Sequence, residues 1–108
     1  MITNFRSMIA ISVTGKRKNS IMDLRFGRSP YFCLFNGDDI TFLNNPYHEE
    51  EHDVAPRVVK LLHENNVQKV ITGEIGAKAK KALEDYQIQI IMLQEDRISL
   101  QEILKKLA

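Results

Sequence analysis

The first half of the chain contains three short apolar segments separated by polar turns. Residues Met8–Val13 are rich in β-branched side chains and are followed by Gly15, a pattern that predicts a buried strand. Residues Tyr31–Phe35 and 40–43 flank the pair Asn36-Gly37, which is the strongest short-range signal for a β-hairpin. We therefore expect one strand followed by an antiparallel pair.

The hairpin also predicts which side chains share a face of the sheet. Successive residues of a strand point to opposite faces, and turns of two or four residues give the same pairing parity. One face then carries Tyr31, Cys33, Phe35, Ile40 and Phe42. The opposite face carries a more mixed set, namely Phe32, Leu34, Asp39, Thr41 and Leu43. We therefore expect Cys33 to face the main core.

The second half of the chain changes to helical spacing. Apolar residues recur at this spacing from Val54 to Leu62, with Asp53 as a candidate N-cap and Pro56 in the first turn, where proline is tolerated. A strand is expected over residues 68–72. The pattern therefore predicts a helix followed by a strand.

Two more helices and one more strand complete the prediction. A second helix is predicted by apolar residues at helical spacing, namely Ile75, Ala79, Ala82, Leu83 and Tyr86. Residues 88–93 form a continuous apolar strand, and Ser99 with Glu102 makes a capping box that opens a third helix. The buried stripe of that helix is Leu100, Ile103, Leu104 and Leu107.

The order of these elements predicts the fold class. The sequence β-β-β-α-β-α-β-α is typical of an α/β domain with a mixed five-stranded sheet, a hairpin at one edge and a parallel half. A chain of 108 residues supports one core but not two. We expect residues 8–108 to form a single domain and residues 1–7 to be an N-terminal extension, without the apolar stretch of an export signal.

Composition narrows the possible functions. The net charge of +1 argues against a general nucleic-acid-binding protein, although a local patch of cations can still bind an anion. No apolar run approaches the length of about 20 residues that a membrane span requires. The single cysteine, Cys33, excludes an internal disulfide and a cysteine-based zinc or iron–sulfur site within one chain. We expect a cytoplasmic protein.

The cations are concentrated where the topology predicts a binding edge. In the predicted sheet, the loop at residues 14–29, the segment 44–53 and the turn 73–76 all lie at the carboxyl end of the parallel strands, where open α/β sheets bind ligands. Five cations lie in the first of these loops: Lys16, Arg17, Lys18, Arg25 and Arg28. They form a candidate clamp for an oxyanion or an anionic cluster, because arginine offers a bidentate fork and lysine a point charge.

The turn Arg25-Phe26-Gly27-Arg28 is the strongest part of this candidate site. Its two arginines are the expected electrostatic clamp, and Phe26-Gly27 is the turn that presents them. The alternative is a solvated loop, in which Asp23 pairs with one of the arginines.

Gly73 and Gly76 flank the start of the second helix, whose exposed N–H groups are able to receive an anion. Against this, Glu74 is expected in the first turn, where it would complement the helix dipole itself. Close packing of the helix start is the other explanation for the glycines.

His48 and His52 are candidate metal ligands. Residues 48–52 satisfy the H-E-x-x-H pattern of zinc proteases, but that pattern needs a helix, and Pro46 and Pro56 on either side argue against a long one. Two imidazoles in a loop remain possible ligands for a metal cluster. The alternative is a hydrophilic loop without a ligand.

The segments Met8–Val13, 21–32, Asn45-Pro46, 70–76 and Ala82-Leu83 together resemble the dinitrogenase iron–molybdenum cofactor biosynthesis family. The resemblance covers roughly residues 8–93. It implies a ribonuclease-H-like three-layer fold and a carrier domain that binds iron–molybdenum cofactor or an iron–sulfur precursor. It also implies a partner protein that donates the cluster to this chain or accepts it from this chain. Some members of the family are stand-alone proteins outside nitrogen fixation, and a related one holds a molybdenum–copper cluster.

The chain departs from the family pattern at the turn. The family commonly has histidine immediately before Phe-Gly, where this chain has Arg25. Arginine binds the periphery of an anionic cluster but cannot replace imidazole as a metal ligand. The segment after Asn45-Pro46, residues 47–52, also differs from the glycine-rich segment usual in the family.

Three functions follow from these observations. The first is a non-enzymatic carrier of an anionic metal cluster or oxyanion. The second is a protein-interaction module that pairs through the hairpin edge at residues 40–43. The third is a metal-dependent hydrolase that uses His48, Glu49 and His52.

Overall fold

The computed structural model describes residues 7–107, so the expected N-terminal extension lies outside the described residues except for Ser7. Five strands and three helices follow one another in the expected order. They are β1 (Met8–Val13), β2 (Tyr31–Phe35), β3 (Ile40–Asn44), α1 (Val54–Glu64), β4 (Val67–Thr72), α2 (Ala77–Asp85), β5 (Gln89–Met92) and α3 (Leu100–Leu107).

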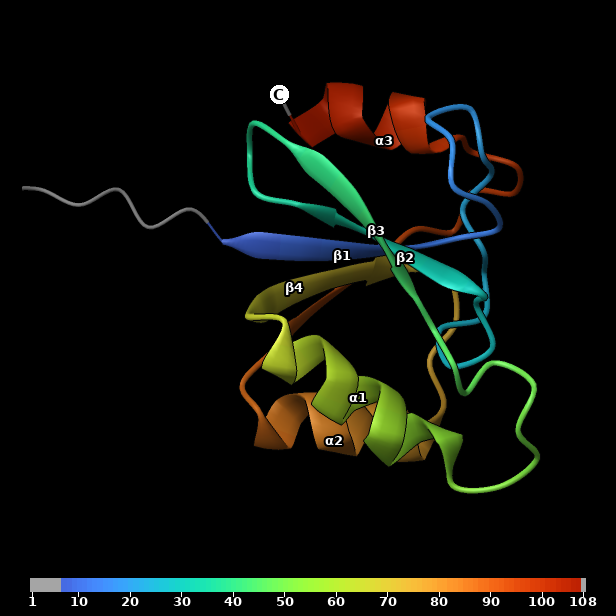
Figure 1. Ribbon diagram of the computed structural model, residues 1–108, viewed down its shortest axis with the longest axis vertical. Coiled ribbons are helices and arrows are strands. Elements are labelled where there is room, and N and C mark those ends of the chain that lie inside the picture. Colours follow the sequence, from blue (N-terminus) through green and yellow to red (C-terminus); the bar gives the residue numbers. More distant parts are fainter. Residues whose placement is uncertain (1–6, 108) are drawn as a thin grey trace, which may run out of the picture.

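The strands form one mixed sheet in the order β3-β2-β1-β4-β5. Strand β2 runs antiparallel to both β1 and β3, whereas β4 runs parallel to β1 and to β5. The predicted α/β fold, with its hairpin edge and parallel half, is confirmed. Helices α1 and α2 cover one face of the sheet and α3 covers the other, which gives three layers (Figure 1).

The hairpin has the four-residue loop that the pairing parity allowed. The Asn36 side chain closes it by accepting hydrogen bonds from the N–H groups of Asp38 and Asp39, and Gly37 takes a φ of 103° that favours glycine. Cys33 pairs with Phe42 across the strands, so the predicted faces of the hairpin are correct.

The prediction that Cys33 faces the main core is wrong. Cys33 is fully buried, but it belongs to the cluster beneath α3, whereas the larger cluster lies beneath α1 and α2 and contains Phe32 and Leu34. In a three-layer fold an inner strand such as β2 is covered on both faces. Counting apolar residues on its two sides therefore does not show which layer is larger.

The helix starts differ in how they are capped. At α3 the predicted capping box is present: the Ser99 Oγ accepts the Glu102 N–H at 3.2 Å, and the Glu102 carboxylate accepts the Ser99 N–H at 3.3 Å. Asp53 occupies the N-cap position of α1 in a left-handed conformation, but its side chain makes no capping hydrogen bond. None of the helices within residues 7–107 is long and apolar enough to cross a membrane.

Candidate functional site

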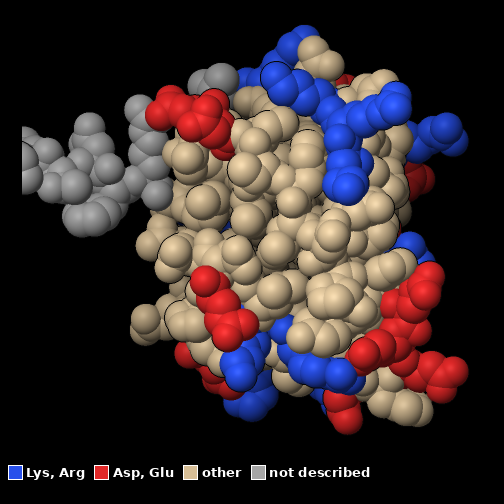
Figure 2. Space-filling view, in the orientation of Figure 1, with Lys and Arg blue, Asp and Glu red and all other residues tan. Residues whose placement is uncertain are grey.

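The structure divides the five clustered cations between two places. The loop after β1 lies against the start of α3, where the Gln101 N–H donates to the Lys18 carbonyl at 2.8 Å and the Lys16 ammonium lies over the Tyr31 ring. Basic side chains accordingly gather around α3 at the top of Figure 2, and a separate group lies over α1 at the lower edge. Arg25 and Arg28 lie elsewhere, so the five cations do not act as one clamp.

The segment that carries Arg25 and Arg28 is fastened along the ends of the parallel strands. Asp23 donates its N–H to the Ser12 carbonyl, and Phe26 donates to the Glu74 carbonyl at 3.2 Å. Arg25 and Glu74 form an isolated parallel bridge, which places the turn beside the end of β4. The expected meeting of the 14–29 loop and the 73–76 turn at this edge is confirmed.

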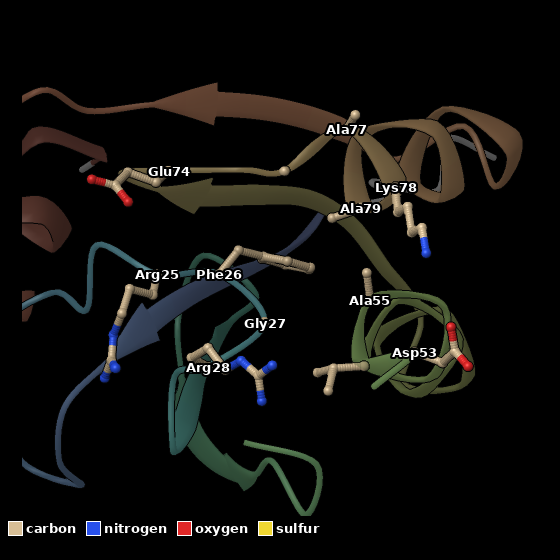
Figure 3. Close-up of a pocket in the computed structure, with 12 residues that line it drawn as sticks. Arg25, Phe26, Gly27, Arg28, Asp53, Ala55, Glu74, Ala77, Lys78 and Ala79 are labelled. Atoms are coloured by element: carbon tan, nitrogen blue, oxygen red, sulfur yellow. The ribbon is translucent and has the colours of Figure 1, made fainter. Parts of the chain in front are cut away.

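A pocket of about 460 Å³ opens between this turn and the starts of α1 and α2 (Figure 3). We call it the rim pocket. Its lining is Arg25, Phe26, Gly27, Arg28, Asp53, Val54, Ala55, Glu74, Gly76, Ala77, Lys78 and Ala79. Five of the predicted binding residues therefore meet here, and Gly73, His48 and His52 do not line the pocket.

Arg28 is the cation directed toward α1. In Figure 3 its guanidinium extends toward the start of that helix. It donates hydrogen bonds to the backbone carbonyls of Glu50 and, at 3.3 Å, of Glu51. Among residues 7–107 no carboxylate forms an ion pair with Arg28. Its positive charge is thus hydrogen-bonded but not neutralised.

Arg25 has a different environment, because its charge is compensated by Asp23. The nearly buried Asp23 carboxylate accepts hydrogen bonds from the Arg25 Nε and Nη2 at 3.2 Å and from the Arg25 N–H at 2.9 Å. This hydrogen bonding and the negative charge of Asp23 raise the pKa of Arg25. The Arg25 side chain remains 62% exposed and points away from α1 in Figure 3. The expected alternative, an Asp23–arginine pair, is what the structure shows for this residue.

Phe26 holds the turn between the two arginines in place, whereas Gly27 has room for a side chain. The Phe26 side chain is buried and packs against the Phe32 ring with centroids 5.6 Å apart. A Cβ atom on Gly27 would lie 3.5 Å from the Val54 side chain at the start of α1, which is an ordinary contact. The buried phenyl ring therefore anchors the turn against the sheet.

Two helix starts face the rim pocket. The first residues of α1, Val54 and Ala55, and of α2, Ala77 and Lys78, both contribute to its lining. Neither of these two described helices has an acidic residue in its first turn or a side-chain hydrogen bond at its N-cap. The expectation that Glu74 lies in the first turn of α2 is wrong, because the helix begins at Ala77 and the Glu74 carboxylate points away from it in Figure 3.

The two glycines before α2 have different surroundings. A Cβ atom on Gly73 would lie 2.5 Å from the Leu24 Cδ2 and 3.0 Å from its Cα, so close packing accounts for this glycine. A Cβ atom on Gly76 would meet no described atom within 4 Å, and Gly76 lines the pocket. Of these two glycines, Gly76 is the one placed where a ligand in the rim pocket could approach it.

His48 and His52 lie in the loop between β3 and α1. Residues 48–52 form turns and bends, not the helix that the zinc-protease pattern requires. The His52 side chain is 87% exposed and lies 3.9 Å from the Glu51 carboxylate. Within residues 7–107 no three His, Cys, Asp or Glu side chains are grouped to hold a metal ion. Metal binding by His48 and His52 remains a prediction.

Arg57 secures that loop from α1. Its guanidinium forms an ion pair with Glu50 at 2.6 Å, donates to the His52 carbonyl at 2.9 Å and stacks over the Tyr47 ring. The segment that accepts hydrogen bonds from Arg28 is therefore held on both sides.

Sequence reasoning did not single out two residues at this edge of the sheet, Asn45 and Lys78, as candidates for the site. The buried Asn45 donates its side-chain N–H groups to the carbonyls of Gly27, at 3.1 Å, and Ser29, at 2.8 Å, and it accepts the Tyr47 N–H. It thereby ties the arginine turn to the loop after β3. Lys78 adds a third cation to the lining of the rim pocket, beside Arg25 and Arg28. The Asn45-Pro46 pair was part of the family resemblance, whereas the position of Lys78 depends on where α2 begins.

Comparison with known proteins gives one family and several similar structures. The family model described as dinitrogenase iron–molybdenum cofactor matches residues 7–108. The apo form of the orange protein from Desulfovibrio gigas has a TM-score of 0.86 at 19% identity, covering 97% of this chain and 89% of its own. A NifB-like protein from Thermotoga has a TM-score of 0.80 at 22% identity, covering 94% and 86%. No functionally curated protein matches the chain in sequence.

Proposed function

Because this chain belongs to the dinitrogenase iron–molybdenum cofactor family, we propose that it is a non-enzymatic carrier that holds an anionic cargo in the rim pocket. The cargo is iron–molybdenum cofactor, an iron–sulfur precursor or an oxyanion. The observation that carries the proposal is the meeting of Arg28 with the uncapped starts of α1 and α2 around one pocket.

Helix starts attract anions for two reasons. The first N–H groups of a helix have no partner within it, and the aligned peptide dipoles place a partial positive charge there. An anion between α1 and α2 would receive hydrogen bonds from both helices. Gly76 leaves open space beside the start of α2, which lets a ligand come close to the backbone.

The charged side chains complete this environment. Arg28 presents a planar fork of N–H donors, and Lys78 adds a point charge on the α2 side. Arg25 lines the same pocket, but its interaction with Asp23 leaves it less able to neutralise cargo. In this proposal Arg28 is the principal cation, and Arg25 mainly holds the turn in place.

Among the described residues, the lining contains three cations and the carboxylates of Asp53 and Glu74, but neither imidazole nor thiol. This donor set suits an anion or the periphery of an anionic cluster, held by charge and hydrogen bonds. Imidazole ligation of a metal atom would need a group from outside the pocket, and His48 and His52 are the candidates on the adjoining loop.

Equilibrium dialysis under anaerobic conditions tests the proposal, with molybdate and isolated iron–molybdenum cofactor as probes and metal analysis as the readout. We expect saturable binding that Arg28→Ala weakens at least about tenfold, since a hydrogen bond to a charged group contributes about 1.5–3 kcal/mol. Arg17→Ala removes the same charge at a residue that does not line the pocket and should bind like the unaltered protein. Failure of both probes to bind, or equal loss in both variants, would reject the proposal.

A further inference from the structure

A second hollow, which we call the helix groove, lies between the exposed sides of α1 and α2. Its volume is about 520 Å³. Its lining is Pro56, Arg57, Lys60, Lys78, Lys81, Ala82, Asp85 and Tyr86. Lys78 also lines the rim pocket, so the two hollows adjoin.

The two sides of the helix groove are basic. Arg57 and Lys60 are three residues apart on α1, and Lys78 and Lys81 are three residues apart on α2, so each helix presents its two cations on one side. Arg57 forms an ion pair with Glu50 at 2.6 Å, outside the groove lining. Lys81 forms an exposed ion pair with Asp85 at 3.6 Å, which is worth little in water. Lys60 and Lys78 form no ion pair with any carboxylate of residues 7–107.

Between these cations the groove is apolar. Pro56 and Ala82 contribute aliphatic surface, and Tyr86 is one of the few large apolar side chains exposed on the described part of the chain, at 39%. The Tyr86 ring stacks on His63 with centroids 4.3 Å apart, which holds it in place. A fixed tyrosine beside unpaired cations is typical of a protein-binding surface.

We propose that the helix groove binds an acidic amphipathic helix of a partner protein. A helix laid between α1 and α2 would bury its apolar stripe against Pro56, Ala82 and Tyr86, and its flanking carboxylates would meet the cations on both sides. An apolar floor with charge only along the sides suits such a helix better than a phosphate backbone. The partner would lie beside the rim pocket through Lys78, so it is the donor or acceptor of cargo if the proposed carrier function holds.

A synthetic helical peptide with a leucine stripe flanked by glutamates is the test probe, and a peptide with lysine in place of each glutamate is its control. Fluorescence anisotropy gives the affinity, and amide chemical shifts of the full chain locate the site. We expect saturable binding of the acidic peptide alone, with shifts in α1 and α2. The Lys60→Glu/Lys81→Glu variant should bind about tenfold more weakly, because charge reversal at the edge of an interface slows association.

The variant Lys105→Glu/Lys106→Glu is the matched control, since it makes the same change of charge on α3, on the opposite face. It should bind the acidic peptide like the unaltered protein. Absence of saturable binding, or equal weakening in the two variants, would overturn the proposal. Tighter binding of single-stranded DNA or of phosphatidylserine vesicles at the same residues would overturn it in favour of those partners.

The outcome is separable from that of the carrier proposal. Lys60 and Lys81 do not line the rim pocket, so their reversal should leave molybdate binding within about twofold of the unaltered value. Peptide binding without molybdate binding would support the helix groove as a docking surface and reject the proposed cargo site. Molybdate binding without peptide binding would support the cargo site and reject the docking surface.

Discussion

Gly73 lies so close to Leu24 that a Cβ atom on the glycine would stand 2.5 Å from the leucine Cδ2. The contact joins the end of β4 to the segment that leads into the arginine turn. It is reinforced by the hydrogen bond that the Glu74 N–H donates to the Leu24 carbonyl. Backbone packing, not ligand access, therefore determines the residue at this position.

Gly73→Ala should accordingly destabilise the fold, whereas Gly76→Ala should not. We expect Gly73→Ala to lower the free energy of unfolding by about 1–3 kcal/mol, the usual cost of overpacking. Gly76→Ala should change it by less than about 1 kcal/mol, because its Cβ has open space and the N-cap φ of −74° suits alanine. Urea denaturation measures both. Equal stability of the two variants would contradict the assigned role of Gly73.

Asn45→Asp should loosen the arginine turn. The amide donates to two carbonyls, of Gly27 and Ser29, and a carboxylate cannot donate to either. We expect a loss of about 1–3 kcal/mol in the free energy of unfolding, since buried acceptors lose their partners. Asn36→Asp is the matched control, because the Asn36 side-chain oxygen accepts hydrogen bonds in the hairpin and a carboxylate retains this ability. An equal effect of the two changes would argue against the role of Asn45.

Cys33 should react with thiol reagents only when the protein unfolds. Burial raises the pKa of its thiol to about 12, so the reactive thiolate is nearly absent at pH 8. The folded pKa lies above the unfolded value of about 8.5. The contribution of the neutral thiol to stability is therefore complete below about pH 8.5 and is lost as pH rises toward 12. Labelling with iodoacetamide should be at least about a hundredfold faster in urea than in buffer, and fast labelling of the folded protein would contradict this burial.

Local patterns predicted the elements well, because each signal was carried by neighbouring residues. The Ser99–Glu102 capping box and the Asn36-Gly37 turn both formed as expected. Three features depend on how distant segments pack: which core is larger, where Arg25 directs its guanidinium, and that Lys78 lines the rim pocket. The sequence therefore predicted the edge of the sheet at which the rim pocket lies, but not which of the two arginines pairs with Asp23.

The double variant His48→Ala/His52→Ala distinguishes ligation of a metal atom by the histidines from electrostatic binding of an anion in the rim pocket. If the histidines ligate a metal atom of a cluster, cluster retention should fall about tenfold or more while molybdate binding stays unchanged. Both side chains lie in the loop after β3 and neither lines the rim pocket, so we expect the fold to survive the change. Far-ultraviolet circular dichroism checks the fold. Unchanged retention of isolated iron–molybdenum cofactor would remove the histidines from the site.

The most direct test of the carrier account is an amide chemical-shift titration of the full chain with molybdate. The account predicts that the largest shifts fall on the N–H groups at the starts of α1 and α2, including Ala55 and Ala77. It also predicts that Arg28→Ala moves the titration to molybdate concentrations at least about tenfold higher. Shifts confined to the basic loop beside α3, or the same shifts at the same concentrations in the Arg28→Ala variant, would contradict it.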